Sequence, residues 1–570
     1  MYCKRLTPTV RLILANAILI GVLCHAGPVF AAEATTDHYF VVPAGADTKT
    51  LGQVKKDLNV QETKPLQGFP DVEVWTLTKP PDRLPADLGS VAWLGQAKGR
   101  PDDLFASVVA ADSLKGSGIP SNVQKRIANI TKSAKGPVRV VTFDVLTAMK
   151  LSGADGVPRG AAGPNGMVLF NANLGQRETL ILKTESTSSD PAGGTLWSGS
   201  LRSGEAPPPL PSDAPVPEKP EVGEFGLSHK DGIVFGQVKI EGTRYSIQPV
   251  GSNYHVLVPM DWSSYPEGHP VLERRSPGKG KHVPEAPRLA FDAGVSPSCT
   301  GPLPNIRIGF VFTKQALKDL NYSSVNDPIA IAWVRQVVGS LSEAFSVAVV
   351  PVAIESAGTF LYTGNEALNV PDAWGTLLSN LKKNPAVTSF RRRNSADLIV
   401  MIAHLQNSGG CGASPMYLMT GEAKFGPANG YSLVSSLGPC PDPAYLTVTH
   451  EIGHLLGLAH DQDALNPPTT SVIDPEARGF AAVTGTSVQQ SKVTVEGYPS
   501  SCARKIIRLH PELTQAARED LVRQACERVA RWSNSGPDPV DGQIGQAGDA
   551  DSARVLPTVV RKVCAYKSQL

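Results

Sequence analysis

The stretch Thr449-His450-Glu451-Ile452-Gly453-His454-Leu455-Leu456-Gly457-Leu458-Ala459-His460-Asp461 decides the fold expected for this chain. Upstream, Asp442-Pro443 offers an N-cap followed by proline at the first helical position, and residues 444–456 are predicted to form a helix. His450 and His454 are then four positions apart. Both imidazoles therefore leave the same face of the helix and can bind one metal ion.

Three further residues of this stretch complete a candidate catalytic site. Glu451 points beside the two histidines, where it can take a proton from a metal-bound water without being a ligand. Gly457 is expected to end the helix in a left-handed conformation, and the turn can bring His460 round as a third ligand. Three neutral imidazoles and one water make an open, four-coordinate zinc site of the catalytic kind. The alternative is an amphipathic helix whose histidines are ordinary core residues.

The spacing HExxHxxGxxH is that of the metzincin metalloproteases, and the stretch 449–461 resembles them. Asp461, directly after the third histidine, is similar to the aspartate of the adamalysin/reprolysin branch, which implies a structural role and not a fourth ligand. More of the chain resembles bacterial reprolysin-like enzymes, including peptidyl-Asp metalloendopeptidases. The segments that follow their order are Ile306 to Thr313, Ala396 to His404, Cys411-Gly412, Tyr431 to Val434, Cys440, Arg531 to Asn534 and Asp549 to Arg554.

This resemblance implies both a fold and an activity. The fold is an α/β (α+β) metzincin catalytic domain with a twisted mixed sheet and an active-site helix, preceded by a β-rich propeptide. The activity is that of a secreted zinc metalloendopeptidase acting on proteins or peptides, with one catalytic zinc ion; the sequence is silent on structural calcium. Glu451 would act as general base and then as general acid. An edge strand near residues 431–435 would hold the substrate by backbone pairing.

One position departs from the metzincin pattern. Metzincins place a methionine in a tight turn beneath the metal, but this chain has no methionine after Met419, and Glu496 stands at the methionine position. A buried carboxylate needs a partner or a proton. Glu496 could pair with a ligand imidazole, approach the metal, or swing to solvent with the turn displaced. This departure keeps a rival function open, that of a zinc-binding pseudoprotease acting as a secreted binding or adhesion protein.

The sequence between the methionine position and the C-terminal segments is also longer than expected. Extra residues lie between Tyr498 and Trp532, with a helix predicted from Pro511 onward. This insert would sit near the wall of the primed-side specificity pocket, where it would alter substrate preference.

The N-terminus predicts export. Positive residues precede an apolar run at 12–23, and Ala31 and Ala32 provide a small-residue cleavage site, so residues 1–31 are predicted to be a signal peptide. The product would be extracellular or periplasmic, with no membrane contact after signal removal; a retained anchor is the alternative. The formal net charge of +2 excludes a strongly basic nucleic-acid binder.

Six cysteines remain after the signal segment, and all lie between residues 299 and 564. An even number in an oxidising compartment predicts disulfides, and Cys411–Cys440 is the expected pair because these two residues bracket a short stretch. Cys299 has two possible roles. It could pair with Cys564 and join the ends of the catalytic domain, or its free thiolate could occupy the open zinc position in a zymogen.

Glycine (53 residues) and proline (48 residues) punctuate the chain into regions. The expected regions are a pro-region at 32–203, a proline-rich linker at 204–223, a β-rich end of the propeptide at 224–265, a linker and processing region at 266–304, and the metallopeptidase domain at 305–570. A retained N-terminal binding domain is the alternative to a propeptide. In the last region, strands at 306–312, 347–354 and 396–404 are expected to alternate with helices at 327–345 and 372–381.

Overall fold

The computed structural model consists of two compact units, Met1–Gln96 and Ala97–Leu570. The structure describes residues 36–41, 48–66, 69–77, 92–95, 103–110, 119–143, 167–170, 180–189, 195–203, 221–230, 233–240, 242–251, 254–265, 299, 303–366, 373–405, 410–414, 426–464, 474–536 and 543–569. The predicted signal peptide, residues 204–220 of the expected linker and residues 266–298 of the expected processing region lie outside these ranges. Among the described residues, no helix is both long and apolar enough to cross a membrane.

The first unit contains an antiparallel sheet with strand order β2-β3-β1-β4. Its elements are β1 (Thr36–Val41), α2 (Thr48–Asp57), β2 (Val60–Leu66), β3 (Phe69–Leu77) and β4 (Ala92–Gly95). Trp75 and Leu77, two positions apart on β3, are buried, and so are Val54 of α2 and, four positions later, Leu58, which follows the last residue of that helix. These spacings match the periods of a strand and a helix, so each element contributes one apolar face to a small core.

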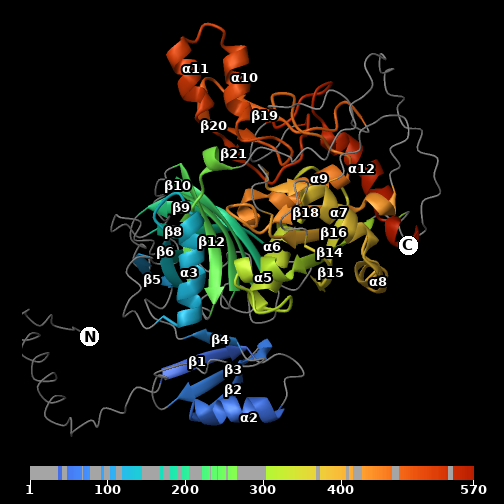
Figure 1. Ribbon diagram of the computed structural model, residues 1–570. Helices are drawn as coiled ribbons and strands as arrows, with labels where there is room; N and C mark the ends of the chain where they lie inside the picture. The colour runs from blue at the N-terminus through green and yellow to red at the C-terminus, as the bar shows by residue number, and fades with distance from the viewer. Residues whose placement is uncertain are drawn as a thin grey trace, which may run out of the picture. The chain divides into compact units, whose positions relative to one another are not determined.

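The second unit begins with a closed barrel in the order β10-β11-β12-β13-β6-β5-β7-β8-β9 (Figure 1). Its strands are β5 (Asp103–Ala110), β6 (Arg139–Phe143), β7 (Met167–Phe170), β8 (Leu180–Ser189), β9 (Thr195–Ser203), β10 (Glu221–Lys230), β11 (Ile233–Ile240), β12 (Thr243–Gly251) and β13 (Tyr254–Pro259). Helix α3 (Ser121–Ser133) packs Val123 and Ile127 into a cluster with Val140, Val250 and Val256 from three of these strands.

The barrel corrects the expected division at residues 204–223. Strands β9 and β10, on either side of this stretch, pair directly, and β10 already begins at Glu221. The prolines therefore mark a connection between neighbouring strands of one barrel and not a boundary between two regions. A closed barrel needs both sets of strands because closure leaves no unpaired edge.

The remainder of the second unit is built on a five-stranded sheet with the order β15-β14-β16-β18-β17. Its strands are β14 (Asn305–Thr313), β15 (Ala353–Tyr362), β16 (Leu398–Ala403), β17 (Gly412–Ala413) and β18 (Tyr431–Ser435). The first four in this order pair in parallel, and β17 alone is antiparallel. Every residue of β16 is buried, as expected for an inner strand covered on both faces. The mixed α/β sheet predicted from the sequence is confirmed.

The sheet corrects the expected substrate-binding edge. Residues 431–435 form β18, which pairs with β16 on one side and with β17 on the other. The edge strand on this side of the sheet is therefore β17, a strand too short and too glycine-rich to give a period-two signal in the sequence.

Four described α-helices lie between β14 and β16 in the chain. They are α5 (Lys314–Asp319), α6 (Pro328–Val347), α7 (Ala373–Lys383) and α8 (Pro385–Arg393). Helix α6 starts as predicted, with Asp327 Oδ1 accepting a hydrogen bond from the Ile329 amide at 2.9 Å and Pro328 in the first turn. The strand expected at 347–354 is wrong: α6 runs through Val347, the chain turns at Val349 (φ 56°), and β15 starts at Ala353. The apolar run there is too short for its hydrophobic periodicity to distinguish the end of a helix from a strand.

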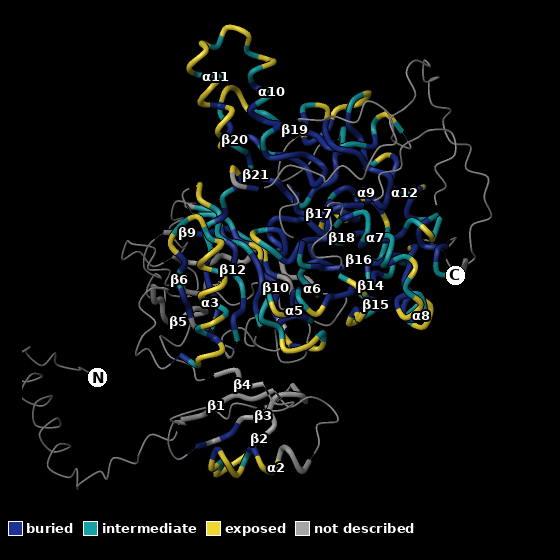
Figure 2. The backbone as a smooth tube through the Cα atoms, in the orientation of Figure 1, coloured by how far each residue is buried: buried dark blue, intermediate teal, exposed yellow. Residues whose placement is uncertain are grey.

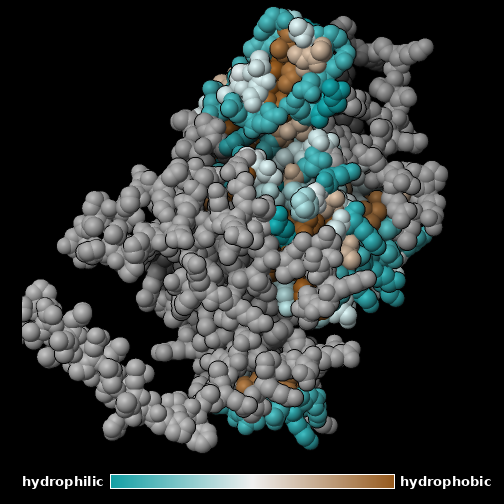
Figure 3. Space-filling view, turned by 90° about the vertical axis from the view of Figure 1, so that its left-hand side faces the viewer, coloured by the Kyte–Doolittle hydropathy of each residue, from teal (hydrophilic) through white to brown (hydrophobic). Residues whose placement is uncertain are grey.

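The C-terminal part carries the zinc-motif helix and the expected insert. Its elements are α9 (Thr447–Leu455), β19 (Ala481–Thr484), β20 (Ser487–Val493), α10 (Ser501–Leu509), α11 (Gln515–Val522), β21 (Glu527–Arg528) and α12 (Ser552–Val563). Figure 2 shows α9 among buried backbone, whereas the α10–α11 hairpin of the insert is largely exposed. Its surface is mainly hydrophilic (Figure 3), although Leu509 and Val522 are exposed there.

The six cysteines between residues 299 and 564 all form disulfides. Cys411 pairs with Cys440 as expected, and Cys299 pairs with Cys564, with 5.8 Å between their Cα atoms. Cys502 pairs with Cys526 across the insert. The bond to Cys564 supports the joining role of Cys299 and excludes the free thiolate of the alternative.

Candidate metal centre

Helix α9 and the turn after it position the three histidines of the motif. The predicted helix 444–456 is shorter than expected: a 3-10 turn (Pro443–Tyr445) follows Asp442, Leu446 is left-handed (φ 57°), and α9 begins only at Thr447. Gly457 ends the helix with φ 81°, as predicted, a conformation that a residue with Cβ adopts only at a cost. The chain then turns back, and a short bridge between Ala459 and Arg478 holds the segment that carries His460.

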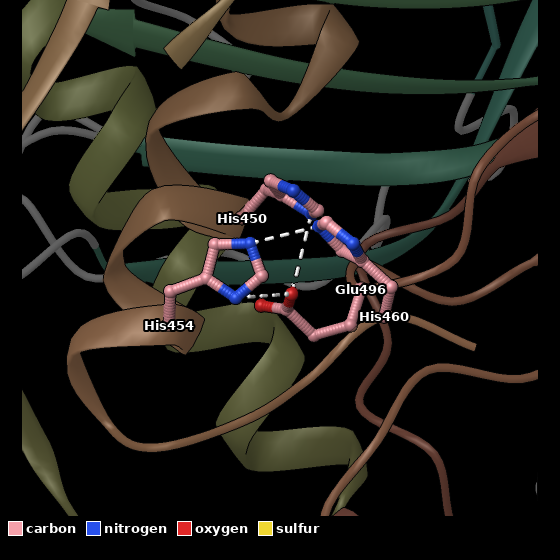
Figure 4. Close-up of side chains that lie close together, drawn as sticks. All are labelled: His450, His454, His460 and Glu496. Atoms are coloured by element: carbon pink, nitrogen blue, oxygen red, sulfur yellow. Dashed lines mark hydrogen bonds and ion pairs between the residues drawn. The ribbon is translucent and has the colours of Figure 1, made fainter. Parts of the chain in front are cut away.

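The three imidazoles converge in the protein interior (Figure 4). His450, His454 and His460 are 2%, 0% and 4% exposed, and Nε2 of His454 lies 3.0 Å from Nε2 of His460. The centroid of the His450 ring lies 4.5 Å from that of the His454 ring and 5.2 Å from that of the His460 ring. The structure therefore brings together all three ligands predicted from the sequence.

Backbone carbonyls orient two of these rings. Nδ1 of His450 lies 2.8 Å from the carbonyl oxygen of Val495, and Nδ1 of His454 lies 2.9 Å from that of Leu458. A carbonyl only accepts, so each Nδ1 carries the proton and each Nε2 keeps its lone pair for a metal. This donor set of buried neutral imidazoles is the chemistry that Zn²⁺ prefers, and the cluster fits a catalytic zinc ion.

Glu451 is buried beside the ligands and is held in place by the edge strand. Ser414, directly after β17, places its Oγ 2.7 Å from Glu451 Oε2 and 2.8 Å from the Glu451 carbonyl oxygen. Gly412 lies so close that a Cβ there would overlap the carboxylate. Burial raises the pKa of Glu451 to about 8, while the Ser414 hydrogen bond and the charge of Arg528 act in the opposite direction. The environment thus favours a carboxyl group that can hold a proton near neutral pH.

Glu496 lies behind the histidines. It is 1% exposed, and its Oε2 is 3.4 Å from Nδ1 of His450 and 3.2 Å from Nδ1 of His454 (Figure 4). Burial raises its pKa well above the usual value, the charge of Glu451 adds to this, and Arg528 opposes it. Of the three arrangements considered from the sequence, the structure supports pairing with the ligand imidazoles and excludes the solvent-exposed one.

Asp461 has the structural role implied by the resemblance. It accepts hydrogen bonds from the Tyr498 amide (2.9 Å), the Ser501 hydroxyl (2.8 Å) and the Asp463 amide (2.9 Å). It is buried, and burial raises its pKa to about 6. Asp461 therefore fastens the third ligand to the turn that contains Glu496 and to the start of α10, and it is outside the metal-ligand cluster.

Three functional neighbours were not identified from the sequence. Ser414 binds Glu451, and the Tyr498 ring packs 4.4 Å from the His460 ring between centroids. Arg528 is buried and donates from Nε to the Gly497 carbonyl at 3.1 Å, which places its charge near both buried glutamates. Only Arg528 could have attracted attention in the sequence, as a charged residue inside the insert. Its distance along the chain from the histidine motif does not predict that it lies near the site.

Known proteins resemble the chain in the same region. The metallo-peptidase family M12B, reprolysin-like, matches residues 346–461. Two peptidyl-Asp metalloendopeptidases from strains of Stenotrophomonas maltophilia are 24% and 25% identical, over 66% and 69% of this chain and 78% and 82% of their own lengths. A peptidyl-Asp metalloendopeptidase from Xanthomonas campestris pv. campestris is 22% identical over 60% of this chain and 69% of its own length.

The family match ends at Asp461 and includes all three histidines and Glu451, and the cluster that the histidines form with Glu496 fits a catalytic zinc ion. The chain therefore carries a reprolysin-like metallopeptidase domain of family M12B, is a homologue of the peptidyl-Asp metalloendopeptidases, and is a zinc metalloendopeptidase.

Proposed function

We propose that this protein is an exported zinc metalloendopeptidase in which His450, His454 and His460 hold the metal and Glu451 is the general base. The observation that carries the proposal is the convergence of three buried imidazoles, two of them with Nδ1 bonded to carbonyls, beside a buried carboxylate. When bound, zinc supplies the Lewis acid that activates water and polarises the scissile carbonyl. Glu451 accepts the water proton and delivers it to the leaving amine.

The substrate binds as an extra strand in this proposal. Strand β17 is the edge of the sheet next to β18, and Ser414 directly after it contacts Glu451. An extended peptide paired with this edge would pass the general base, because backbone hydrogen bonds would hold the peptide alongside β17. Cleavage next to aspartate, which the names of the relatives indicate for those proteins, is the first preference to test.

The barrel is the inhibitory part of a propeptide in this proposal. The segment that follows the last barrel strand contacts α9: the Tyr265 hydroxyl lies 2.9 Å from Oγ1 of Thr447, three residues before His450. The Tyr265 ring stacks on Tyr445 with 5.6 Å between centroids, and Nη1 of Arg528 donates to the Tyr265 hydroxyl at 3.1 Å. Cleavage between residues 266 and 298, where the basic pair Arg274-Arg275 lies, would cut this tail from the enzyme while leaving Cys299 with its partner.

Export rests on the predicted signal peptide at residues 1–31, and the disulfides favour an oxidising compartment.

A chelator-controlled cleavage assay tests the proposed activity. The processed protein is incubated with a mixed peptide library, with and without a zinc chelator, alongside Glu451→Gln. We expect chelator-sensitive cuts from the native protein and a loss of rate of at least about 10² to 10⁴ in Glu451→Gln, which keeps the ligands and should retain zinc. Full activity of Glu451→Gln would reject the assigned base. No cuts from folded, zinc-loaded native protein would favour the binding or adhesion pseudoprotease.

A further inference from the structure

The turn beneath the histidines contains a carboxylate whose position serves no step of the proposed reaction. We propose that Glu496 is an outer-shell acceptor for the metal site: it strengthens zinc binding through the Nδ1 atoms of His450 and His454. This inference rests on the zinc site of the proposed function. It adds a positioning residue that does not touch substrate or zinc.

The contacts distinguish an outer-shell acceptor from a fourth ligand. A single oxygen, Oε2, lies 3.4 Å and 3.2 Å from the two Nδ1 atoms. Those Nδ1 atoms already donate to the carbonyls of Val495 and Leu458, so they are protonated and cannot bind metal. The Nε2 atoms that can bind metal lie on the opposite side of each ring, and Figure 4 shows Glu496 on the Nδ1 side. Glu496 therefore acts on zinc through the rings.

Charge gives this contact its effect. Three neutral imidazoles leave both positive charges of a bound Zn²⁺ uncompensated in a buried site, and buried charge is costly without a partner. A carboxylate acceptor behind a ligand imidazole increases the basicity of that ligand and fixes its orientation. Because Oε2 faces two ligands at once, one side chain can affect two of the three bonds to zinc.

The same carboxylate should cost stability when the metal is absent. Among the described residues, no hydrogen bond of ordinary geometry reaches either oxygen of Glu496, Oε2 meets the two Nδ1 atoms only at the longer distances given above, and the side chain is 1% exposed. Its Oε1 also occupies the space where a Cβ of Gly453 would lie, so the group is enclosed by the zinc helix. The proposal therefore predicts effects of opposite sign on removing the carboxylate: weaker zinc binding, and an apo protein that is equally stable or more stable.

The test uses the full chain with Glu496→Gln and Glu496→Met. Zinc dissociation constants are measured by competition with a chromogenic chelator, and Tm is measured for apo and zinc-loaded protein. We expect both variants to raise the zinc dissociation constant about 10- to 100-fold, with an apo Tm at or above that of the native chain. Asp397→Asn is the matched control, because Asp397 is also a buried carboxyl group but bonds the amides of Arg307 and Lys567 and no histidine.

The outcomes separate the inference from the function on which it rests. Zinc affinity within about two-fold of native in both variants would overturn the role of Glu496, as would a fall in apo Tm together with zinc affinity, which marks a merely structural residue. If one variant fails to fold, zinc affinity and Tm of the other decide the question. Glutamine keeps the shape of the glutamate side chain without its charge, whereas methionine removes both its charge and its polar atoms. A native chain that binds zinc but cuts no peptide would reject the proposed function and leave this test intact. A native chain that binds no zinc would overturn both.

Discussion

At the scale of single residues, the centre depends on polar groups that burial makes sensitive to their neighbours. The Glu451 carboxylate accepts a hydrogen bond from the Ser414 hydroxyl, and burial raises the pKa of this glutamate to about 8. A hydrogen bond to a buried charged group is worth more than one in water, so losing Ser414 should matter more than losing an exposed serine.

Ser414→Ala should lower kcat about 10-fold and leave KM nearly unchanged, because the contact orients the proposed base, Glu451, and does not bind substrate. Steady-state kinetics on a peptide substrate measures both constants. The matched control is Ser432→Ala in β18, since the Ser432 hydroxyl is buried but has no hydrogen-bond partner among the described residues. Equal kinetics for the two variants would contradict the orienting role of Ser414.

Asp397 should make the stability of the fold depend on pH. Burial raises its pKa from 3.8 to about 6, against the hydrogen bonds from the Arg307 and Lys567 amides. The folded state therefore holds a proton that the unfolded state has lost, and this stabilisation is full below pH 4 and lost as pH rises through 6. The difference between 3.8 and about 6 corresponds to roughly 3 kcal/mol.

The comparison of native protein with Asp397→Asn isolates this contribution. Denaturant unfolding of both at pH 4, 5, 6 and 7 should show the native chain losing stability relative to the variant across this range. A native chain that gains stability relative to the variant as pH rises would contradict the raised pKa.

At the scale of elements, the turn after α9 brings a third candidate ligand, His460, to the two candidate ligands on the helix. Gly457 has φ 81°, and the segment it redirects carries His460 and the Asp461 side chain that fastens Tyr498 and Ser501. The insert is attached to the site by the same aspartate and by Arg528. The start of α10 is thereby tied to the turn after α9, which carries the candidate ligand His460, although the two are separate in sequence.

Gly457→Ala should destabilise the fold by about 1–2 kcal/mol and weaken zinc binding, because a Cβ disfavours the left-handed turn that places His460. Thermal unfolding and chelator competition measure the two effects. Gly485→Ala is the control: Gly485 also has positive φ (56°), no described atom lies within 4 Å of the position that its Cβ would take, and it lies between β19 and β20. This control should lose stability and keep native zinc affinity; unchanged zinc affinity in Gly457→Ala would contradict the prediction.

At the scale of the second compact unit, the barrel is joined to the metallopeptidase part by charged contacts with the insert. Glu527 of β21 pairs with Arg244 of β12 and with Lys239 of β11, the latter at 3.1 Å, and its side chain is 11% exposed. At a second contact, between α3 and the start of α6, Arg126 Nη2 lies 3.1 Å from Asp327 Oδ2. Replacing Glu527 removes the ion pair of Lys239, whereas Arg244 keeps its pair with Glu224, and losing one partner of a shielded ion pair costs more than the pair contributes.

Glu527→Gln should therefore loosen the barrel once the chain has been cut between residues 266 and 298. We expect the barrel of the cleaved variant to dissociate at a protein concentration about 10-fold higher than that at which the barrel of the cleaved native protein dissociates. Peptidase activity should appear in parallel. Size-exclusion chromatography across a dilution series, with activity measured in each fraction, gives both readouts. Glu343→Gln, which removes an ion pair to Arg531 within the metallopeptidase part, should leave barrel binding unchanged. Equal dissociation of the two nicked variants would reject the docking role of Glu527.

Sequence alone determined the features that depend on local spacing. The i, i+4 histidines, the adjacent glutamate and the helix-ending glycine have fixed relations along one helix and its turn, so the candidate ligands could be predicted without tertiary information. The same is true of the start of α6 at Asp327-Pro328. It is also true of β16, because its uninterrupted apolar sequence predicts a buried strand. The signal peptide at residues 1–31 remains a prediction of the same local kind.

Only the tertiary structure decided what surrounds those residues. The acceptors behind the histidines, the Ser414 contact with Glu451, the edge position of β17 and the closure of the barrel across residues 204–220 all join segments with no shared period or motif. Glu496 shows the physical reason most clearly. The sequence revealed a carboxylate where methionine was expected, but packing against α9 decided which of its possible partners it meets, because contacts between distant segments depend on how whole elements fill the core.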